Sequence, residues 1–170
     1  MDSESARMSS AAEVRFRIDY PNSKPRAVKV VALDAASERV IKRVAERNWQ
    51  QATFFTSLKF DGAPRSGEGW SMEGWLRDLA GRTKALVEEV ASADLVVMVS
   101  SAGTCAQAAA VIGEACAVRK VMTTALIIGS EQHSDEELSK TLATLRPHAS
   151  MLVIASGDEY IEEMLAALRA

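Results

Sequence analysis

The sequence between Asp94 and Thr104 reads Asp-Leu-Val-Val-Met-Val-Ser-Ser-Ala-Gly-Thr. The apolar run from Leu95 to Val99 is typical of a strand that is buried on both faces of a parallel sheet. It leads into a turn of small and hydroxyl-bearing residues, Ser100 to Thr104, and an apolar helical segment follows from Cys105. Such a turn at the start of a helix is the usual geometry for binding an anion or a phosphate group.

The rest of the chain alternates strand patterns with helix patterns. Apolar strands are predicted at 28–33, 52–58, 95–99, 121–128 and 151–155. Helices are predicted at 36–49, 73–93, 105–118, 134–147 and 158–168. This order predicts an α/β protein with a three-layer, Rossmann-like fold, in which helices cover both faces of a mostly parallel sheet. Ligands of such folds bind beyond the carboxyl ends of the strands, so the turns after the strands are the candidate sites.

Other segments define the domain organisation. Residues 1–12 are rich in Ser and Ala without a period, so we expect a flexible N-terminal segment before a single domain at 13–170. Residues 13–20 alternate apolar and charged side chains, which predicts an antiparallel strand at a sheet edge. Residues 60–72 hold three glycines and a proline, which predicts a mobile loop. Trp70 and Trp75 flank this loop and suit either stacking on a base or a partner, or folding the loop back onto the sheet.

Composition and charge narrow the class of protein. The net charge of −3 and the pI near 5.5 give no basic surface of the kind that nucleic-acid binding requires. The cations at 39, 42, 43 and 47 are interleaved with acidic residues at helical spacing, which favours a solvated helix face. No signal segment opens the chain, and no apolar run approaches the roughly 18 residues of a membrane span. Cys105 and Cys116 would lie about 16 Å apart on one helix, too far for a disulfide. We therefore expect a cytoplasmic protein that binds neither nucleic acid nor a membrane.

Three stretches of the chain resemble the nucleotide-binding half of the tubulin/FtsZ superfamily. The family opens with a strand, a turn and a helix, as do residues 28–31 and 40–44 here. Its phosphate loop follows Ala-Asp and an apolar strand and reads Gly-Gly-Gly-Thr-Gly-Thr-Gly-Ala-Ala-Pro-Val-Ile. The present chain has Ala93-Asp94, the apolar strand, and then Gly-Thr-Cys-Ala-Gln-Ala-Ala-Ala-Val-Ile at 103–112. The helix, strand and turn at 145–158 resemble the end of the family's domain, so the likeness covers roughly residues 28–168.

The resemblance implies a nucleotide or another phosphate-bearing ligand, bound through glycine loops that are degenerate here. Glycine lets backbone amides approach phosphate oxygens with positive φ angles. The first turn has Asp34 and no glycine, and the main loop keeps only Gly103. We also expect no second domain that could supply the acidic catalytic loop that the family lends to a neighbouring subunit. We therefore do not expect GTP hydrolysis.

The residues placed at the carboxyl ends of the predicted strands form the candidate ligand site. They are Ser100, Ser101, Gly103, Thr104, Asp34 and Ser156. Hydroxyls and helix amides suffice for a small anionic ligand, and the alternative is that Ser101 or Thr104 caps the following helix. Asp34 suits contact with a ribose or a metal ion, or capping of its own helix, and we favour the cap.

The remaining reactive side chains give weaker signals. Cys105 would lie in the first turn of a helix, where the helix dipole favours a nucleophilic thiolate, although burial among alanines is the competing interpretation. Cys116 is predicted to lie in the core. His133 and His148 lack ligand spacing, so we expect no metal site.

Three hypotheses of function follow. The first is a tubulin/FtsZ-like domain that binds a small anionic ligand at Ser100 to Thr104, or that has lost this ability and acts as an assembly or regulatory module. The second is a small enzyme with Cys105 as nucleophile. The third is a structural, self-associating domain. The alanine-rich helices and the predicted edge strand at 13–20 suggest a homo-oligomer.

Overall fold

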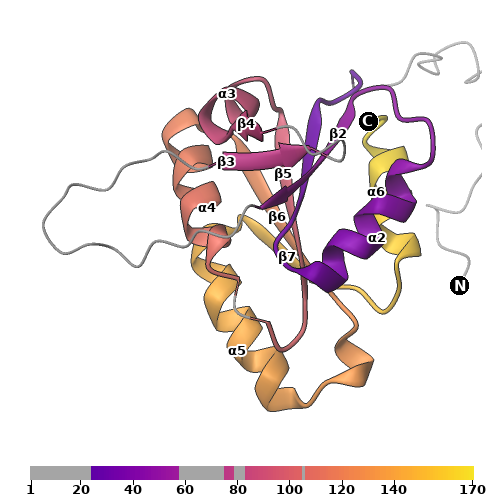
Figure 1. Cartoon of the computed structure of the whole chain (residues 1–170), viewed down its shortest axis with the longest axis vertical. Coiled ribbons are helices and arrows are strands. Elements are labelled where there is room, and N and C mark those ends of the chain that lie inside the picture. Colours follow the sequence, from indigo (N-terminus) through magenta and orange to yellow (C-terminus); the bar gives the residue numbers. More distant parts are fainter. Residues whose placement is uncertain (1–23, 58–74, 79–82, 105) are drawn as a thin grey trace, which may run out of the picture.

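The computed structural model describes residues 24–57, 75–78, 83–104 and 106–170. These residues form one seven-stranded sheet in the order β4-β3-β2-β1-β5-β6-β7 (Figure 1). The five parallel strands are β1 (Val28–Ala32), β2 (Ala52–Ser57), β5 (Leu95–Ser101), β6 (Met122–Ile128) and β7 (Met151–Ile154). Two short antiparallel strands, β3 (Trp75–Asp78) and β4 (Thr83–Ala85), extend the sheet beyond β2.

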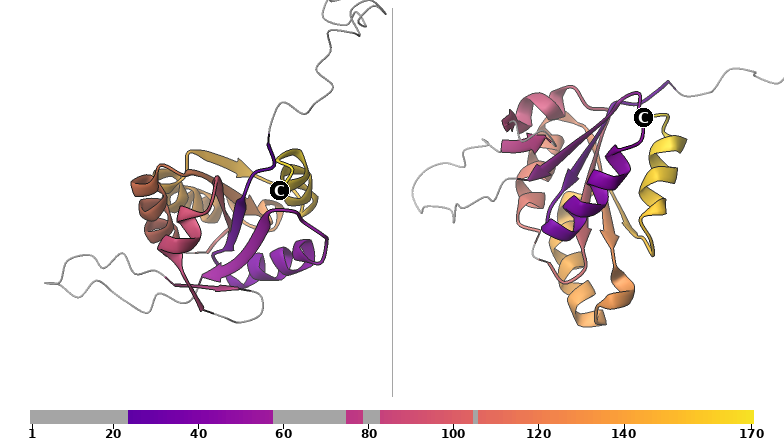
Figure 2. Two further views of the ribbon diagram at one scale, coloured as in Figure 1. Left: turned by 90° about the horizontal axis from the view of Figure 1, so that it is seen from above. Right: turned by 45° about the vertical axis from the view of Figure 1, so that its right-hand side comes forward.

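Helices cover both faces of the sheet. One face packs against α2 (Ala35–Ala45) and α6 (Glu159–Ala167), which lie side by side in Figure 2. The other face packs against α3 (Leu86–Ala91), α4 (Ala108–Arg119) and α5 (Asp135–Leu145). Two single 3₁₀ turns, η2 (Ser130–Gln132) and η3 (Arg146–His148), flank α5. The fold is therefore the three-layer, Rossmann-like α/β architecture that the sequence predicts.

The central strands are apolar because both of their faces are buried. All seven residues of β5 are buried, and it pairs along its whole length with β6. On β6, Leu126 packs into the cluster beneath α2 and α6, while its neighbour Ile127 packs into the cluster beneath α3, α4 and α5. Alternate residues of a strand point to opposite faces, so a run of buried residues requires a helical layer on each side.

The helix predicted over 73–93 is wrong in its first part. Residues 75–78 and 83–85 are the strands β3 and β4, and the helix α3 begins only at Leu86. The backbone of β3 pairs with β2 through Phe55 opposite Asp78 and Thr56 opposite Arg77. Gly81 disfavours a continuous helix. Pairing of β3 with β2 and of β4 with β3 gives the backbone groups of these strands their partners. The long-range pairing thus overrides the local helical periodicity.

Several predictions fall on residues that the structure does not describe. They are the flexible segment at 1–12, the edge strand at 13–20, and the loop at 60–72 with Trp70; the position of Trp75 is in β3. In the part of the chain that is described, no helix has the length and apolar character needed to cross a bilayer.

Candidate functional site

The candidate site lies where the strand order of the parallel sheet reverses. The chain passes from β1 to β2 on one side and later returns to β5 on the other side of β1. In open α/β sheets, ligands bind beyond the carboxyl ends of the two strands at such a switch point. Asp34 follows β1 and the turn Ser100 to Thr104 follows β5. The fold therefore brings together two turns that the sequence analysis singled out separately.

Asp34 caps helix α2, as the sequence predicts. Its Oδ1 atom accepts hydrogen bonds from the amides of Ala36 at 3.0 Å and Ser37 at 2.9 Å. The Ser37 hydroxyl oxygen in turn accepts a hydrogen bond from the Asp34 amide at 3.2 Å, which completes a capping box. Two of the four free amides at the start of α2 are satisfied in this way.

The same carboxylate also binds the turn after β5. Its Oδ2 atom accepts a hydrogen bond from the Ser101 amide at 2.8 Å, and its Oδ1 atom accepts one from the Ser101 hydroxyl at 2.9 Å. The hydroxyls of Ser100 and Thr104 each lie 3.2 Å from Oδ2 and 3.0 Å from one another. Asp34 therefore joins the two strand ends of the switch point through one side chain.

Hydrogen bonding keeps Asp34 ionised despite its partial burial. Burial is the largest single influence and by itself raises the pKa of the carboxyl. The amides of Ser37 and Ser101 and the hydroxyls of Ser101 and Ser100 act in the opposite direction, and together they hold the pKa below its ordinary value of 3.8. The site thus contains a fixed negative charge at neutral pH.

This charge disfavours the binding of a second anion to the same donors. Three backbone amides and the Ser101 hydroxyl point at the Asp34 carboxylate, all within 3.0 Å. A second anion about 4 Å from it would be repelled by roughly 4 kcal/mol at an effective dielectric constant of 20. A hydrogen bond to a charged group contributes only about 1.5–3 kcal/mol. A phosphate group would therefore have to displace Asp34 before it could bind here.

Helix α5 fixes the other end of the β5 turn. Gly103 has a φ angle of +80°, a conformation that favours glycine, and its amide donates a hydrogen bond to the hydroxyl oxygen of Thr141 at 3.0 Å. Thr141 is fully buried. A Cβ atom on Gly103 would lie 3.1 Å from Nδ1 of His133, which itself lies 3.4 Å from the Glu137 carboxylate.

Sequence reasoning missed Thr141 and the place of His133. The sequence offers one signal for Thr141, which is that a hydroxyl residue lies on the inward face of the predicted helix. That face is marked by Leu138, Leu142 and Leu145. Its partner Gly103 lies 38 positions earlier in the chain, so periodicity gives no hint of the contact.

The other predicted site residues have different surroundings. Ser156 is exposed beyond the end of β7, which is separated from β5 by β6, so it does not join the Asp34 cluster. The N-cap of α4 is Gln107, without a side-chain capping bond, so the interpretation that Ser101 or Thr104 caps this helix is wrong. The Thr104 hydroxyl instead donates to the Ser101 carbonyl at 2.8 Å.

Of the two cysteines, Cys116 is the one that lies in the described part of the chain. Cys105 lies outside the described residues, so its predicted role as a nucleophile stays a prediction. The helix predicted from position 105 begins at Ala108. Cys116 is buried in the core as predicted, and burial raises the pKa of its thiol to about 11. Among the described residues, no three His, Cys, Asp or Glu side chains are grouped so that they could hold a metal ion.

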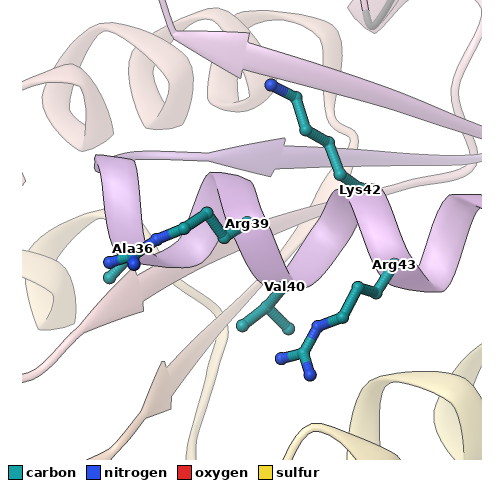
Figure 3. Close-up of a pocket in the computed structure, with 5 residues that line it drawn as sticks. All are labelled: Ala36, Arg39, Val40, Lys42 and Arg43. Atoms are coloured by element: carbon teal, nitrogen blue, oxygen red, sulfur yellow. The ribbon is translucent and has the colours of Figure 1, made fainter.

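A surface groove of about 560 Å³ runs along α2 and is lined by Ala36, Arg39, Val40, Lys42 and Arg43 (Figure 3). Lys42 points to the opposite side of the helix from Val40 and Arg43. Lys42 pairs with Glu38 at 2.6 Å, and Arg43 pairs with Asp158 at the start of α6. These carboxylates already balance two of the cations that line the groove, which weakens the groove as a site for an anion.

Comparison with family models and with curated proteins finds no relative. No family model matches the sequence, and no curated protein matches it significantly. The ends of β1 and β5, where amide and hydroxyl donors surround one ionised carboxylate, are therefore the feature from which a function can be inferred.

Proposed function

We propose that this protein is a non-hydrolysing, Rossmann-like assembly or regulatory module, similar to the nucleotide-binding half of the tubulin/FtsZ superfamily. In this proposal Asp34 takes the place of the phosphate group, and the switch point holds the domain together instead of binding a nucleotide. The observation that carries the proposal is the position of the Asp34 carboxylate, which accepts hydrogen bonds from the turns after both β1 and β5.

The direction in which the backbone amides point supports the proposal that the Asp34 side chain replaces a bound phosphate. In phosphate-binding folds, the free amides of a helix N-terminus and of the neighbouring turn point at the bound anion. Here the amides of Ala36, Ser37 and Ser101 point at one carboxylate of the protein itself. The donors are therefore arranged as in an anion site, but the anion that they bind is the Asp34 side chain of the protein itself.

The protonation state of the cluster supports the absence of hydrolysis. A general base is most effective when its pKa lies near the working pH. The pKa of Asp34 is held below 3.8, so its carboxylate is a weak base toward a hydroxyl or a water. The hydroxyls of Ser100 and Thr104 contact each other as well as Asp34, which makes them structural donors in this proposal.

Chemical rescue of an Asp34→Ala variant tests the proposal. The wild type should show no thermal shift with inorganic phosphate, GDP or GTP, because its donors are occupied. Asp34→Ala should melt at a lower temperature, since the helix cap alone contributes about 1 kcal/mol. Acetate or phosphate should then raise the melting temperature of this variant in a concentration-dependent way, because each can fill the vacated position.

The matched control is Asp158→Ala. Asp158 also lies at the start of a helix, but its side chain makes no capping hydrogen bond and pairs with Arg43 on the surface. This variant should not be rescued by either anion. A clear stabilisation of the wild type by phosphate or by either nucleotide would overturn the proposal, as would an Asp34→Ala variant that no anion stabilises.

A further inference from the structure

The edge strand β7 presents an uncharged, apolar surface. Its sequence is Met-Leu-Val-Ile, and it ends the sheet on the side opposite to β4. Met151 is 50% exposed and Ile154 is 45% exposed, and Met122 at the start of the neighbouring strand β6 is 56% exposed. Outward-facing backbone groups of an edge strand are available for pairing with another strand. Among the described residues, no strand pairs with the outer edge of β7.

Apolar side chains are exposed on both faces of this edge. Val153 packs against the cluster beneath α2 and α6, whereas Leu152 packs against the cluster beneath α3, α4 and α5. Because side chains alternate along a strand, Met151 lies on the face of Val153 and Ile154 on the face of Leu152. Neither helical layer therefore covers the strand completely.

Natural edge strands are usually protected against pairing by Lys, Pro or a bulge. β7 contains no charged residue and no proline, and its four residues pair in unbroken register with Thr124 to Ile127 of β6. The edge thus has the features of a strand that is paired in the assembled protein.

The charges that precede and follow these two strands are complementary to those of a second copy of this chain. Exposed basic residues lie at the amino ends of β6 and β7, namely Lys120 and Arg146. Exposed acidic residues lie at the carboxyl ends of the same strands, namely Glu131 and Glu159. A second copy that runs antiparallel brings the basic end of each edge to the acidic end of the other. A parallel copy would instead bring like charges together.

We propose that β7 pairs with β7 of a second copy of this chain, antiparallel and about a two-fold axis, so that one continuous sheet crosses the dimer. This inference rests on the assembly role proposed above and names its contact surface. A two-fold contact is self-complementary by construction, because the same patch meets itself. Because each edge is basic at one end and acidic at the other, two copies of the same chain are complementary in charge.

The alternation of side chains restricts the register of the contact. A two-fold axis perpendicular to the sheet keeps α6 on the same face in both copies, so residues of equal parity must lie opposite one another. The central pair is then either Leu152 with Leu152 or Val153 with Val153. Opposed Cα atoms of antiparallel strands lie about 4.5–5.5 Å apart, which is within the range that a disulfide spans.

Sedimentation velocity of the full chain tests the inference. The wild type should form dimers between about 1 and about 100 µM, a range of ordinary homodimer affinities. Met151→Lys and Ile154→Lys should each raise the dimer dissociation constant at least about tenfold, since a charge would be buried at the contact. Asn48→Lys is the matched control, because Asn48 is exposed just before β2, a strand that β1, β5 and β6 separate from β7. It should leave the dissociation constant unchanged.

Cysteine cross-linking tests the geometry independently of any loss of stability. In a Cys105→Ser background, only one of the variants Leu152→Cys and Val153→Cys should form a disulfide-linked dimer under oxidation. A monomeric wild type at every concentration overturns the inference, and so does a dimer that survives both lysine variants or that neither cysteine cross-links. These outcomes can be distinguished from those of the Asp34 test. That test measures how acetate or phosphate changes the melting temperature of Asp34→Ala, and it does not depend on β7.

Discussion

At the scale of single residues, Asp34 performs two structural tasks with one carboxylate. It caps α2 through the amides of Ala36 and Ser37, and it holds the β5 turn through Ser101. The first task is local, and a sequence reader can predict it from an Asp before a helix pattern. The second joins positions 67 residues apart and needs the fold to bring them together.

The pKa of Asp34 predicts how stability depends on pH. Because the folded-state pKa lies below the ordinary value of 3.8, the ionised carboxylate stabilises the folded state above that value. This contribution is lost as the pH falls through the folded-state pKa. At neutral pH, Asp34→Asn should be less stable than the wild type by about 1–2 kcal/mol, because neutral hydrogen bonds replace charge-assisted ones.

Urea unfolding of both proteins between pH 7 and pH 3 measures this effect. The gap between the two unfolding free energies should be constant near neutral pH and should narrow once the pH falls below about 4. A gap that stays the same down to pH 3 would show that Asp34 does not gain its stability as a carboxylate.

At the scale of elements, the position of the β5 turn depends on helix α5. The Thr141 hydroxyl oxygen accepts a hydrogen bond from the Gly103 amide at 3.0 Å. It also lies 3.2 Å from the carbonyl oxygen of Glu137 in its own helix. Thr141→Val keeps the shape of the side chain but leaves the Gly103 amide without this acceptor. We expect a loss of about 1–3 kcal/mol in unfolding free energy.

Thr144→Val is the control for this prediction. Thr144 lies on the same helix and its hydroxyl donates only within the helix, to the Lys140 carbonyl at 3.0 Å. Its replacement should change the unfolding free energy by less than about 0.5 kcal/mol. Equal effects of the two variants in urea unfolding would mean that the contact between α5 and the β5 turn does not stabilise the protein.

The helices and strands differ in how well the sequence predicts them. The strands β1, β5 and β6 follow from apolar runs, and the capping box of Ser134 and Glu137 correctly marks the start of α5. Helical periodicity mispredicts the segment before Leu86, because β3 pairs with β2 and β4 pairs with β3, and periodicity does not report such long-range pairing. The candidate site was only half predictable for a similar reason. Its residue types were visible, but the contact between Asp34 and Ser101 that fills it was not.

At the scale of the whole molecule, the three-layer architecture makes a direct prediction for neighbouring residues of one strand. Leu126 and Ile127 of β6 are both fully buried, but in different clusters on opposite faces of the sheet. In a sheet with one solvated face, only one of two such neighbours would contribute to a core. Here Leu126→Ala and Ile127→Ala should each lower the unfolding free energy by about 2–5 kcal/mol, because each leaves a cavity beneath a helical layer.

The double variant sharpens this prediction. The two side chains share no cluster, so their effects should add to within about 0.5 kcal/mol in urea unfolding, provided that the double variant still folds. Met122→Ala on the same strand is the control, since Met122 is largely exposed and its replacement should have a small effect in the monomer. A loss of less than about 1 kcal/mol of unfolding free energy in either core variant would contradict the prediction, because it would mean that one face of the sheet has no tightly packed helical layer.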